Sequence, residues 1–287
     1  MNRPMLRRLL LLLLLLALTL LLSYSAHAQS AALNPVKARL KAGGTSLGII
    51  VSIPSAPVAQ ILARTGIDWI WIDMEHAAID LASMHALIAA TQGTGVVPLV
   101  RVGITDPVPV KPVLDAGAMG VIFPMIKSVE DAKLAVASTL YPPAGIRGVG
   151  PHTAPARWGL SPREYLARAN ENILTVLLVE TQEALKNLDA ILAVPGIDVA
   201  MIAPMDLSAS FGKPGQFNDP EIAAAIAQAE QTILKSKVAL GGLALSAERA
   251  NHLLAQGYRF LLLTTDGALL RSGAEAMLQG IQRPDAR

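Results

Sequence analysis

Eight short apolar runs, separated by stretches with helical spacing, limit the folds open to this chain more than any other feature. The runs cover residues 47–52, 69–73, 97–101, 120–124, 174–180, 199–203, 238–244 and 260–264. They are rich in Val, Ile and Leu with few polar residues, which is typical of parallel strands buried on both faces. The intervening stretches 56–64, 81–91, 108–116, 129–139, 182–193, 220–236 and 247–255 are amphipathic. Several of them end at a glycine, the usual helix stop signal.

This alternation predicts the fold class. Strands that alternate with helices form a parallel sheet covered by helices, which is an α/β architecture. Eight such units within roughly 250 residues favour a closed (β/α)8 TIM barrel, folded as a single domain, over an open sheet. Neither of the common nucleotide-binding glycine motifs follows a predicted strand, so a nucleotide-binding fold is less favoured.

The first residues have the layout of a secretory signal peptide. A basic start is followed by a leucine-rich run over residues 9–22 and by a small-residue site that ends at Ala28. The run is short for a membrane span, which needs ~20 apolar residues. We therefore expect residues 1–28 to be a signal peptide cut after Ala28, with an uncleaved anchor as the alternative. Residues 29–287 then form the barrel domain, periplasmic or secreted, without stable membrane association after cleavage.

Charge and cysteine content exclude some classes of function. The net charge is +2, and removal of Arg3, Arg7 and Arg8 with the leader makes it −1. No basic stripe suited to nucleic acid is present, so we expect no nucleic-acid partner. The chain contains no cysteine, which excludes disulfides and a cysteine-linked lipid anchor.

One stretch interrupts the alternation. Residues 141–170 are rich in Pro, Gly and Arg and lie between the fourth and fifth predicted strands. Loops of this length in compact domains are usually functional or disordered. We interpret this stretch as a loop that covers a substrate or contacts another subunit.

Active sites of such barrels lie at the carboxyl ends of the strands, where this chain places several polar residues. They are Asp73, Glu75 and His76 after the second strand, Arg101 after the third, Glu180 after the fifth, Asp206 after the sixth and 264–266 after the eighth. Glu180 and Asp206 end adjacent strands, and two carboxylates suit a hard divalent ion. Arg101 can bind a carboxylate with two hydrogen bonds. His76 can transfer a proton, with Asp73 orienting its imidazole.

Each residue also has a structural interpretation. Asp206 can cap the next helix, Glu180 can open one, Arg101 can form a rim ion pair, and a lone histidine is more often structural than catalytic. Their joint occurrence on one rim is what favours an active site.

Beyond these residues, the chain resembles the HpcH/HpaI family of class II aldolases, which act on 2-oxo-3-deoxy and 4-hydroxy-2-oxo acids. The matching stretches are GIDWIWIDMEHA (66–77), VPLVRV (97–102), LDAGAMGVIFPMI (114–126), YPPAGIRGVG (141–150), VETQEALKN (179–187) and PGIDVAMIAPMDLSASFG (195–212). The likeness runs from about residue 35 to about residue 274, and YPPAGIRGVG is its most specific part. The resemblance also implies a (β/α)8 barrel.

The resemblance implies a metal-dependent aldolase that releases pyruvate and an aldehyde through a pyruvate enolate. Glu180 and Asp206 would bind Mg²⁺ or Mn²⁺, with Co²⁺ as a further option. His76 and Asp73 would act as the acid/base pair, and Arg101 would bind the pyruvate moiety. Asp115 matches a carboxylate that supports the site of a neighbouring subunit, because family members form homohexamers.

The chain departs from the family pattern at two positions that face the substrate. Leu178 stands where a glutamine is usual, and Met205 stands where a small residue is usual. Both departures put substrate preference in doubt, as does the leader.

Two alternatives stay open. One is a lyase of the citrate-lyase-β or malyl-CoA type on the same scaffold, although no basic cluster for a CoA phosphate is evident. The other is a non-catalytic periplasmic protein that binds an oxo acid.

Overall fold

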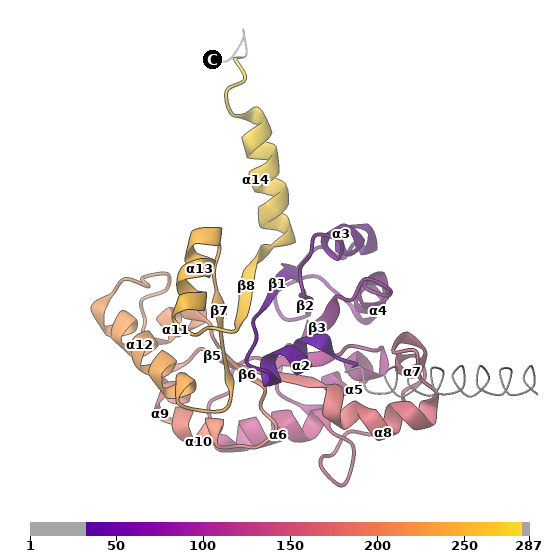
Figure 1. Ribbon diagram of the computed structural model, residues 1–287. Coiled ribbons are helices and arrows are strands. Elements are labelled where there is room, and N and C mark those ends of the chain that lie inside the picture. The colour runs from indigo at the N-terminus through magenta and orange to yellow at the C-terminus, as the bar shows by residue number, and fades with distance from the viewer. Residues whose placement is uncertain (1–32, 283–287) are drawn as a thin grey trace, which may run out of the picture. The chain divides into compact units, whose positions relative to one another are not determined.

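The computed structural model describes residues 33–282, and these form a closed barrel of eight parallel strands (Figure 1). Each strand pairs with the next along the chain, and β8 pairs with β1 to close the cylinder. The strands are β1 Ser46–Val51, β2 Trp69–Asp73, β3 Val97–Arg101, β4 Gly120–Phe123, β5 Leu174–Val179, β6 Val199–Ile202, β7 Ala239–Leu243 and β8 Phe260–Thr265. The predicted (β/α)8 barrel is therefore confirmed, and the predicted leader lies outside the described residues.

Helices follow the strands, and most of them cover the outside of the barrel. They are α3 Ala56–Leu62, α4 Leu81–Ala90, α5 Pro107–Asp115, α6 Val129–Thr139, α9 Gln182–Lys186, α10 Leu188–Leu192, α11 Pro204–Ser210, α12 Pro220–Leu234, α13 Ala247–Ala255 and α14 Asp266–Leu278. The predicted helix over 182–193 is two helices that meet at Asn187. The side chain of Asn187 donates a hydrogen bond to the carbonyl of Lys127 at 2.7 Å, which fixes this residue between the two helices.

The interior of the barrel is filled by alternate residues of the strands, because successive side chains of a strand point to opposite faces. Trp69, Leu99, Val176, Met201 and Phe260 belong to this buried cluster. Trp69 and Phe260 stack with parallel rings whose centroids lie 4.1 Å apart. The barrel is thus a packed core with no open channel through it.

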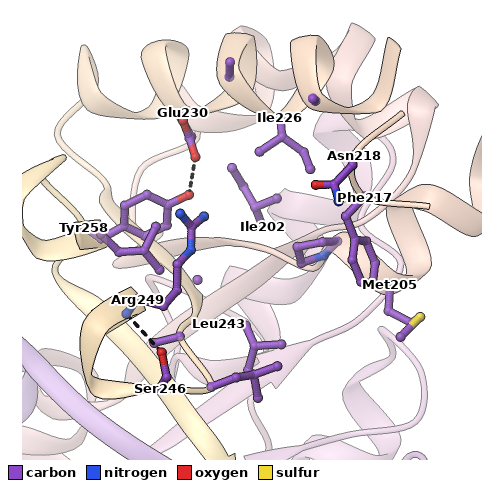
Figure 2. Close-up of a pocket in the computed structure, with 17 residues that line it drawn as sticks. Ile202, Met205, Phe217, Asn218, Ile226, Glu230, Leu243, Ser246, Arg249 and Tyr258 are labelled. Atoms are coloured by element: carbon purple, nitrogen blue, oxygen red, sulfur yellow. Dashed lines mark hydrogen bonds between the residues drawn. The ribbon is translucent and has the colours of Figure 1, made fainter. Parts of the chain in front are cut away.

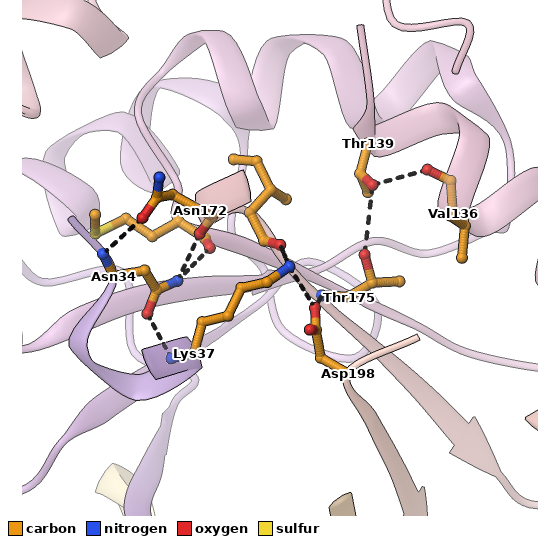
Figure 3. Close-up of polar contacts among 9 residues, drawn as sticks. Asn34, Lys37, Val136, Thr139, Asn172, Thr175 and Asp198 are labelled. Carbon is orange, nitrogen blue, oxygen red and sulfur yellow. Dashed lines mark hydrogen bonds and ion pairs between the residues drawn. The ribbon is translucent and has the colours of Figure 1, made fainter. Parts of the chain in front are cut away.

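Helix α2 (Pro35–Lys41) closes the amino end of the barrel (Figure 3). Its Val36 and Leu40 pack into the interior cluster. The ammonium of Lys37 lies 2.8 Å from the carboxylate of Asp198, and Asn34 donates to the carbonyls of residues 119 and 172. Residues 119, 172 and 198 all lie just before strands, so α2 occupies the end opposite the rim of polar residues.

The predicted long loop 141–170 contains two helices, α7 Ala154–Arg157 and α8 Pro162–Asn172. A capping box between Ser161 and Glu164 starts α8, which is why this Pro-containing stretch still folds as a helix. The prediction of one long loop was therefore wrong for its second half. Its proposed contact with a substrate or another subunit stays a prediction.

Helix α14 differs from the other helices, because it extends away from the barrel (Figure 1). All residues of 269–282 are exposed, including Leu270 and Met277. No helix within residues 33–282 has the length and apolar character that crossing a membrane requires.

Candidate active site

Three strands bring Asp73, Arg101 and Glu180 to the carboxyl rim of the barrel. Asp73 ends β2 and is paired in register with Arg101, which ends β3. Glu180 follows β5 directly, in the row of interior side chains that includes Val176 and Leu178. Because side chains alternate along a strand, all three point into the mouth of the barrel. All three are also buried, unlike ordinary rim charges.

Asp73 and Arg101 form a two-point ion pair. The Nε of Arg101 donates to Oδ1 of Asp73 at 2.9 Å, and Nη2 donates to Oδ2 at 2.6 Å. Burial alone would raise the pKa of Asp73, but the hydrogen bond and charge of Arg101 outweigh it and leave the pKa lowered. Asp73 is therefore a carboxylate at neutral pH.

Arg101 contacts two further side chains at the rim. Its Nη1 lies 3.0 Å from a carboxylate oxygen of Glu75, and its guanidinium carbon lies 4.9 Å from the ring centroid of Trp71. A guanidinium held in this way is the group that can bind a carboxylate through parallel N–H groups.

The contacts of His76 differ from those we expected. Its imidazole lies beside Glu75, with Nε2 3.5 Å from a carboxylate oxygen, and 62% of its side chain is exposed. Asp73 instead accepts a hydrogen bond from the backbone N–H of His76 at 3.3 Å. The expected pairing of Asp73 with the imidazole was therefore wrong in this structure, because Arg101 occupies the carboxylate of Asp73. No role was expected for Glu75 from the sequence. In the structure its carboxylate lies between the guanidinium of Arg101 and the imidazole of His76.

Glu180 is deeply buried, with 3% exposure. Burial, together with the nearby charges of Asp206 and Glu75, raises its pKa to about 7. The backbone N–H of Met125 donates to Glu180, which partly offsets this effect. Met125 has a φ of 55°, a left-handed conformation that costs energy for a side chain other than glycine. The strained backbone after β4 thus helps to hold Glu180.

Asp206 lies in the first turn of α11, close enough to Glu180 to affect its charge. It is the third residue of the helix and does not cap it, since Ala203 holds the cap position. Glu180 does not open a helix either, because Thr181 caps α9. Both structural interpretations of these acids are therefore wrong.

The donor set suits one divalent cation. Within residues 33–282, no group of three or more His, Asp or Glu side chains could hold a metal ion, so a site would rest on two carboxylates with other ligands from water or substrate. Glu180 is a buried carboxyl group whose charge is disfavoured by burial and by Asp206. A bound cation would remove that penalty, so these residues fit the hard divalent ion that we expected.

Leu178 and Met205 were both expected to contact the substrate, and their surroundings differ from each other. Leu178 is buried in the barrel interior, one layer below Glu180, and offers no polar group there. Met205 is 58% exposed, directly before Asp206 on the rim.

Asp115 is not part of the site of its own chain. It ends α5 and accepts a hydrogen bond from Nη2 of Arg147 at 2.8 Å. Helix α5 ends just before β4 begins, so Asp115 lies toward the amino end of the barrel. Support of a neighbouring subunit's site by Asp115 stays a prediction.

Asp266 has a positioning role that sequence reasoning missed. It is 1% exposed at the end of β8, and its carboxylate accepts hydrogen bonds from the backbone N–H groups of Ser52, Ile53 and Gly267 and from the Ser52 hydroxyl. It therefore ties the loop after β1 to β8 at the rim. The polar ending TTD of the last apolar run was the available signal.

Comparisons with known proteins show the family of the chain. The profile of the family described as HpcH/HpaI aldolase/citrate lyase matches residues 47–273. A 4-hydroxy-2-oxo-heptane-1,7-dioate aldolase of Klebsiella pneumoniae is 41% identical over 245 residues, which cover 85% of this chain and 92% of that protein. A crystal structure of an HpcH/HpaI aldolase/citrate lyase family protein from Burkholderia cenocepacia superposes with a TM-score of 0.80 at 33% identity, covering 86% of this chain and 98% of that one. A crystal structure of the citrate synthase SbnG superposes with a TM-score of 0.77 at 28% identity, covering 86% and 96% of the two chains.

Proposed function

The chain belongs to the HpcH/HpaI aldolase/citrate lyase family as a class II aldolase, and we propose that it cleaves a 4-hydroxy-2-oxo acid, or a related 2-oxo-3-deoxy sugar acid, to pyruvate and an aldehyde. The observation that carries this proposal is the convergence of Arg101, Glu180 and Asp206 on one rim with His76 at its edge. A cation and a pair of metal-binding carboxylates are what a 2-oxo acid requires for binding.

Aldolases of this family use divalent metals, and Glu180 and Asp206 are the residues that would hold Mg²⁺, Mn²⁺ or Co²⁺ here. Such an ion, when bound, supplies positive charge next to the 2-oxo oxygen. Arg101, which Asp73 holds at the mouth of the barrel, binds the substrate carboxylate. Asp73 keeps the guanidinium in place, since two hydrogen bonds fix its plane.

His76 moves the proton. Its exposed imidazole accepts the proton of the 4-hydroxyl as the bond between C3 and C4 breaks. The electron pair of that bond goes to the pyruvate fragment as an enolate, and C4 leaves as the aldehyde. A proton added to C3 then gives pyruvate. Glu75 lies beside this imidazole, with a carboxylate oxygen 3.5 Å from Nε2.

We also propose that the protein assembles into a homo-oligomer, by resemblance a hexamer. The support is α14, whose exposed Leu269, Leu270 and Met277 contribute an apolar surface that a single barrel leaves uncovered. We further propose that the protein is exported to the periplasm or out of the cell and loses residues 1–28. The support is the layout of the leader.

The test is pyruvate release by the purified mature protein from a panel of 4-hydroxy-2-oxo acids. We expect release with Mn²⁺ or Mg²⁺, loss with EDTA, and recovery when metal is restored. Glu180→Gln should be inactive with either metal, while Arg39→Lys, a surface change far from the rim, should match the wild type. Metal binding without pyruvate release from any substrate would favour the non-catalytic oxo-acid binding protein. Release of CoA from a thioester would identify the CoA-type lyase.

A further inference from the structure

A cavity of about 690 Å³ lies between α12 and α13, outside strands β6 and β7 (Figure 2). Its walls are mostly apolar and include Ile202, Ile226, Leu243 and Phe217. The volume is within the ~300–1,000 Å³ range of small-molecule pockets and far larger than the voids of a packed core.

The far end of the cavity is polar, and one of its hydroxyl groups already has a hydrogen-bond partner. The hydroxyl of Tyr258 donates to a carboxylate oxygen of Glu230 at 2.6 Å, and Arg249 lies beside them (Figure 2). The Tyr258 ring lies against Gly242, where a Cβ would stand 2.4 Å from a ring carbon. Because the Tyr258 hydroxyl has its partner, an apolar ligand can cover this wall without leaving that hydroxyl unpaired.

The near end of the cavity adjoins the proposed active site. Pro204 and Met205, which line it, directly precede Asp206 in the chain. Leu243 lines it too and also packs against the interior cluster of the barrel. A substrate whose pyruvate part lies at the rim would therefore extend its aldehyde part past Met205 into the cavity.

The mouth of the cavity exposes apolar side chains. Met205 is 58% exposed, Leu245 is 69% exposed and Phe217 is 41% exposed. Leu245 also has a φ of 48°, and within residues 33–282 only Met125 shares this left-handed conformation among non-glycine residues. Strained residues of this kind concentrate at binding sites, and Met125 is already part of the proposed one.

From these observations we propose that the cavity binds the distal part of the substrate, and that this part is a bulky apolar group, aromatic or branched. The inference rests on the proposed aldolase function and narrows its substrate class. Two methylenes and a carboxylate, as in a heptanedioate, would fill only a small part of the cavity.

The experiment compares two substrates that share the reacting atoms. 4-Hydroxy-2-oxopentanoate has a methyl tail, and 4-hydroxy-2-oxo-6-phenylhexanoate has a phenylethyl tail; retro-aldol cleavage releases pyruvate from both. Ala223→Trp and Ala227→Trp each place an indole in the cavity from exposed positions on α12. Ala224→Trp is the matched control, since Ala224 is exposed on the same helix but does not line the cavity.

We expect the wild type to prefer the phenyl substrate by about 10-fold or more in kcat/KM, as apolar pockets allow. Both cavity variants should lose that preference by about 10-fold while cleaving the pentanoate normally, and Ala224→Trp should behave as the wild type. If the wild type and the three tryptophan variants prefer the phenyl substrate to the same degree, the inference is overturned and the aldolase function stays intact. Equal losses on both substrates with a smaller assembled mass would also overturn it, and would make the cavity a subunit contact.

Calorimetric binding of the phenyl acid to the same proteins separates this inference from the proposed function. If no protein releases pyruvate, the proposed function fails. Weaker binding to Ala227→Trp than to Ala224→Trp would then still support the cavity as a ligand site, and equal binding would overturn it.

Discussion

Arg101 connects the charges of the rim, because it contacts Asp73 through two nitrogens and Glu75 through a third. Lysine would keep the charge but would lose the planar fork. We expect Arg101→Lys to lower kcat/KM about 100-fold, comparable to loss of one donor at an oxyanion site. Steady-state pyruvate release checks this, with Arg39→Lys as the control, because Arg39 pairs with Asp68 on the surface. Comparable activity of the two variants would remove Arg101 from the site.

Glu180 makes stability depend on pH when no metal is bound. Its pKa is raised from an ordinary 4.5 to about 7 by burial and nearby acids, so the folded state holds a proton that the unfolded chain releases. Stability is therefore greatest below pH 4.5 for this group and is lost as pH rises toward 7, by up to about 1.4 kcal/mol per pH unit. With EDTA present, the Tm difference between Glu180→Gln and the wild type should grow in favour of the variant from pH 5 to 8. A constant difference would contradict the raised pKa.

The location of a site side chain could be predicted from sequence where its position on a strand fixes it. A strand end at the rim places Arg101 and Glu180 in the mouth, because the alternation of side chains leaves no other direction. The hydrogen-bond and ion-pair partners of these side chains were less predictable. Asp73 and Glu75 both precede His76, and only the three-dimensional arrangement shows that Arg101 contacts both carboxylates and that Glu75 also lies beside the imidazole. The left-handed conformation of Met125 could not be predicted, because methionine, unlike glycine or asparagine, does not favour a positive φ.

At the scale of elements, β1 and β2 show how the interior is fitted. Gly48 faces Trp69, and a Cβ there would lie 2.1 Å from the indole. We expect Gly48→Ala to destabilise the protein by about 1–3 kcal/mol, since Trp69 is also held by Phe260. Gly273→Ala should instead stabilise α14 by about 0.5–1 kcal/mol, because its Cβ would meet open space in a helix. Urea unfolding measures the change in the free energy of unfolding for each variant. Destabilisation by both substitutions would contradict this packing.

Strand limits were predicted to within one residue at each end, because apolar runs between glycines and polar residues mark both ends. Helices were harder to predict. The division at Asn187 depends on a contact with the distant Lys127, and α8 depends on a capping box inside a Pro- and Gly-rich stretch. The strand limits and the capping box of α8 are local signals, whereas the division at Asn187 depends on a tertiary contact.

For the whole molecule, α14 is the element that a single barrel does not explain. Residues 269–282 are exposed, and Leu270 and Met277 are among the largest apolar groups there. We expect Leu270→Asp to lower the assembled mass measured by light scattering, because a buried charge opposes association. Ser272→Asp is the control on the same exposed helix and should keep the wild-type mass. Equal masses for all three proteins would show that α14 makes no subunit contact.

We infer that the rim formed by Arg101, Glu180, Asp206 and His76 stabilises the enolate of pyruvate. The most direct measurement is exchange of the pyruvate methyl protons in D₂O, followed by NMR, because it needs no knowledge of the aldehyde. We expect exchange that requires Mn²⁺ or Mg²⁺, stops with EDTA, and is absent in Glu180→Gln. Pyruvate that binds in the presence of metal but exchanges no faster than in buffer would contradict it.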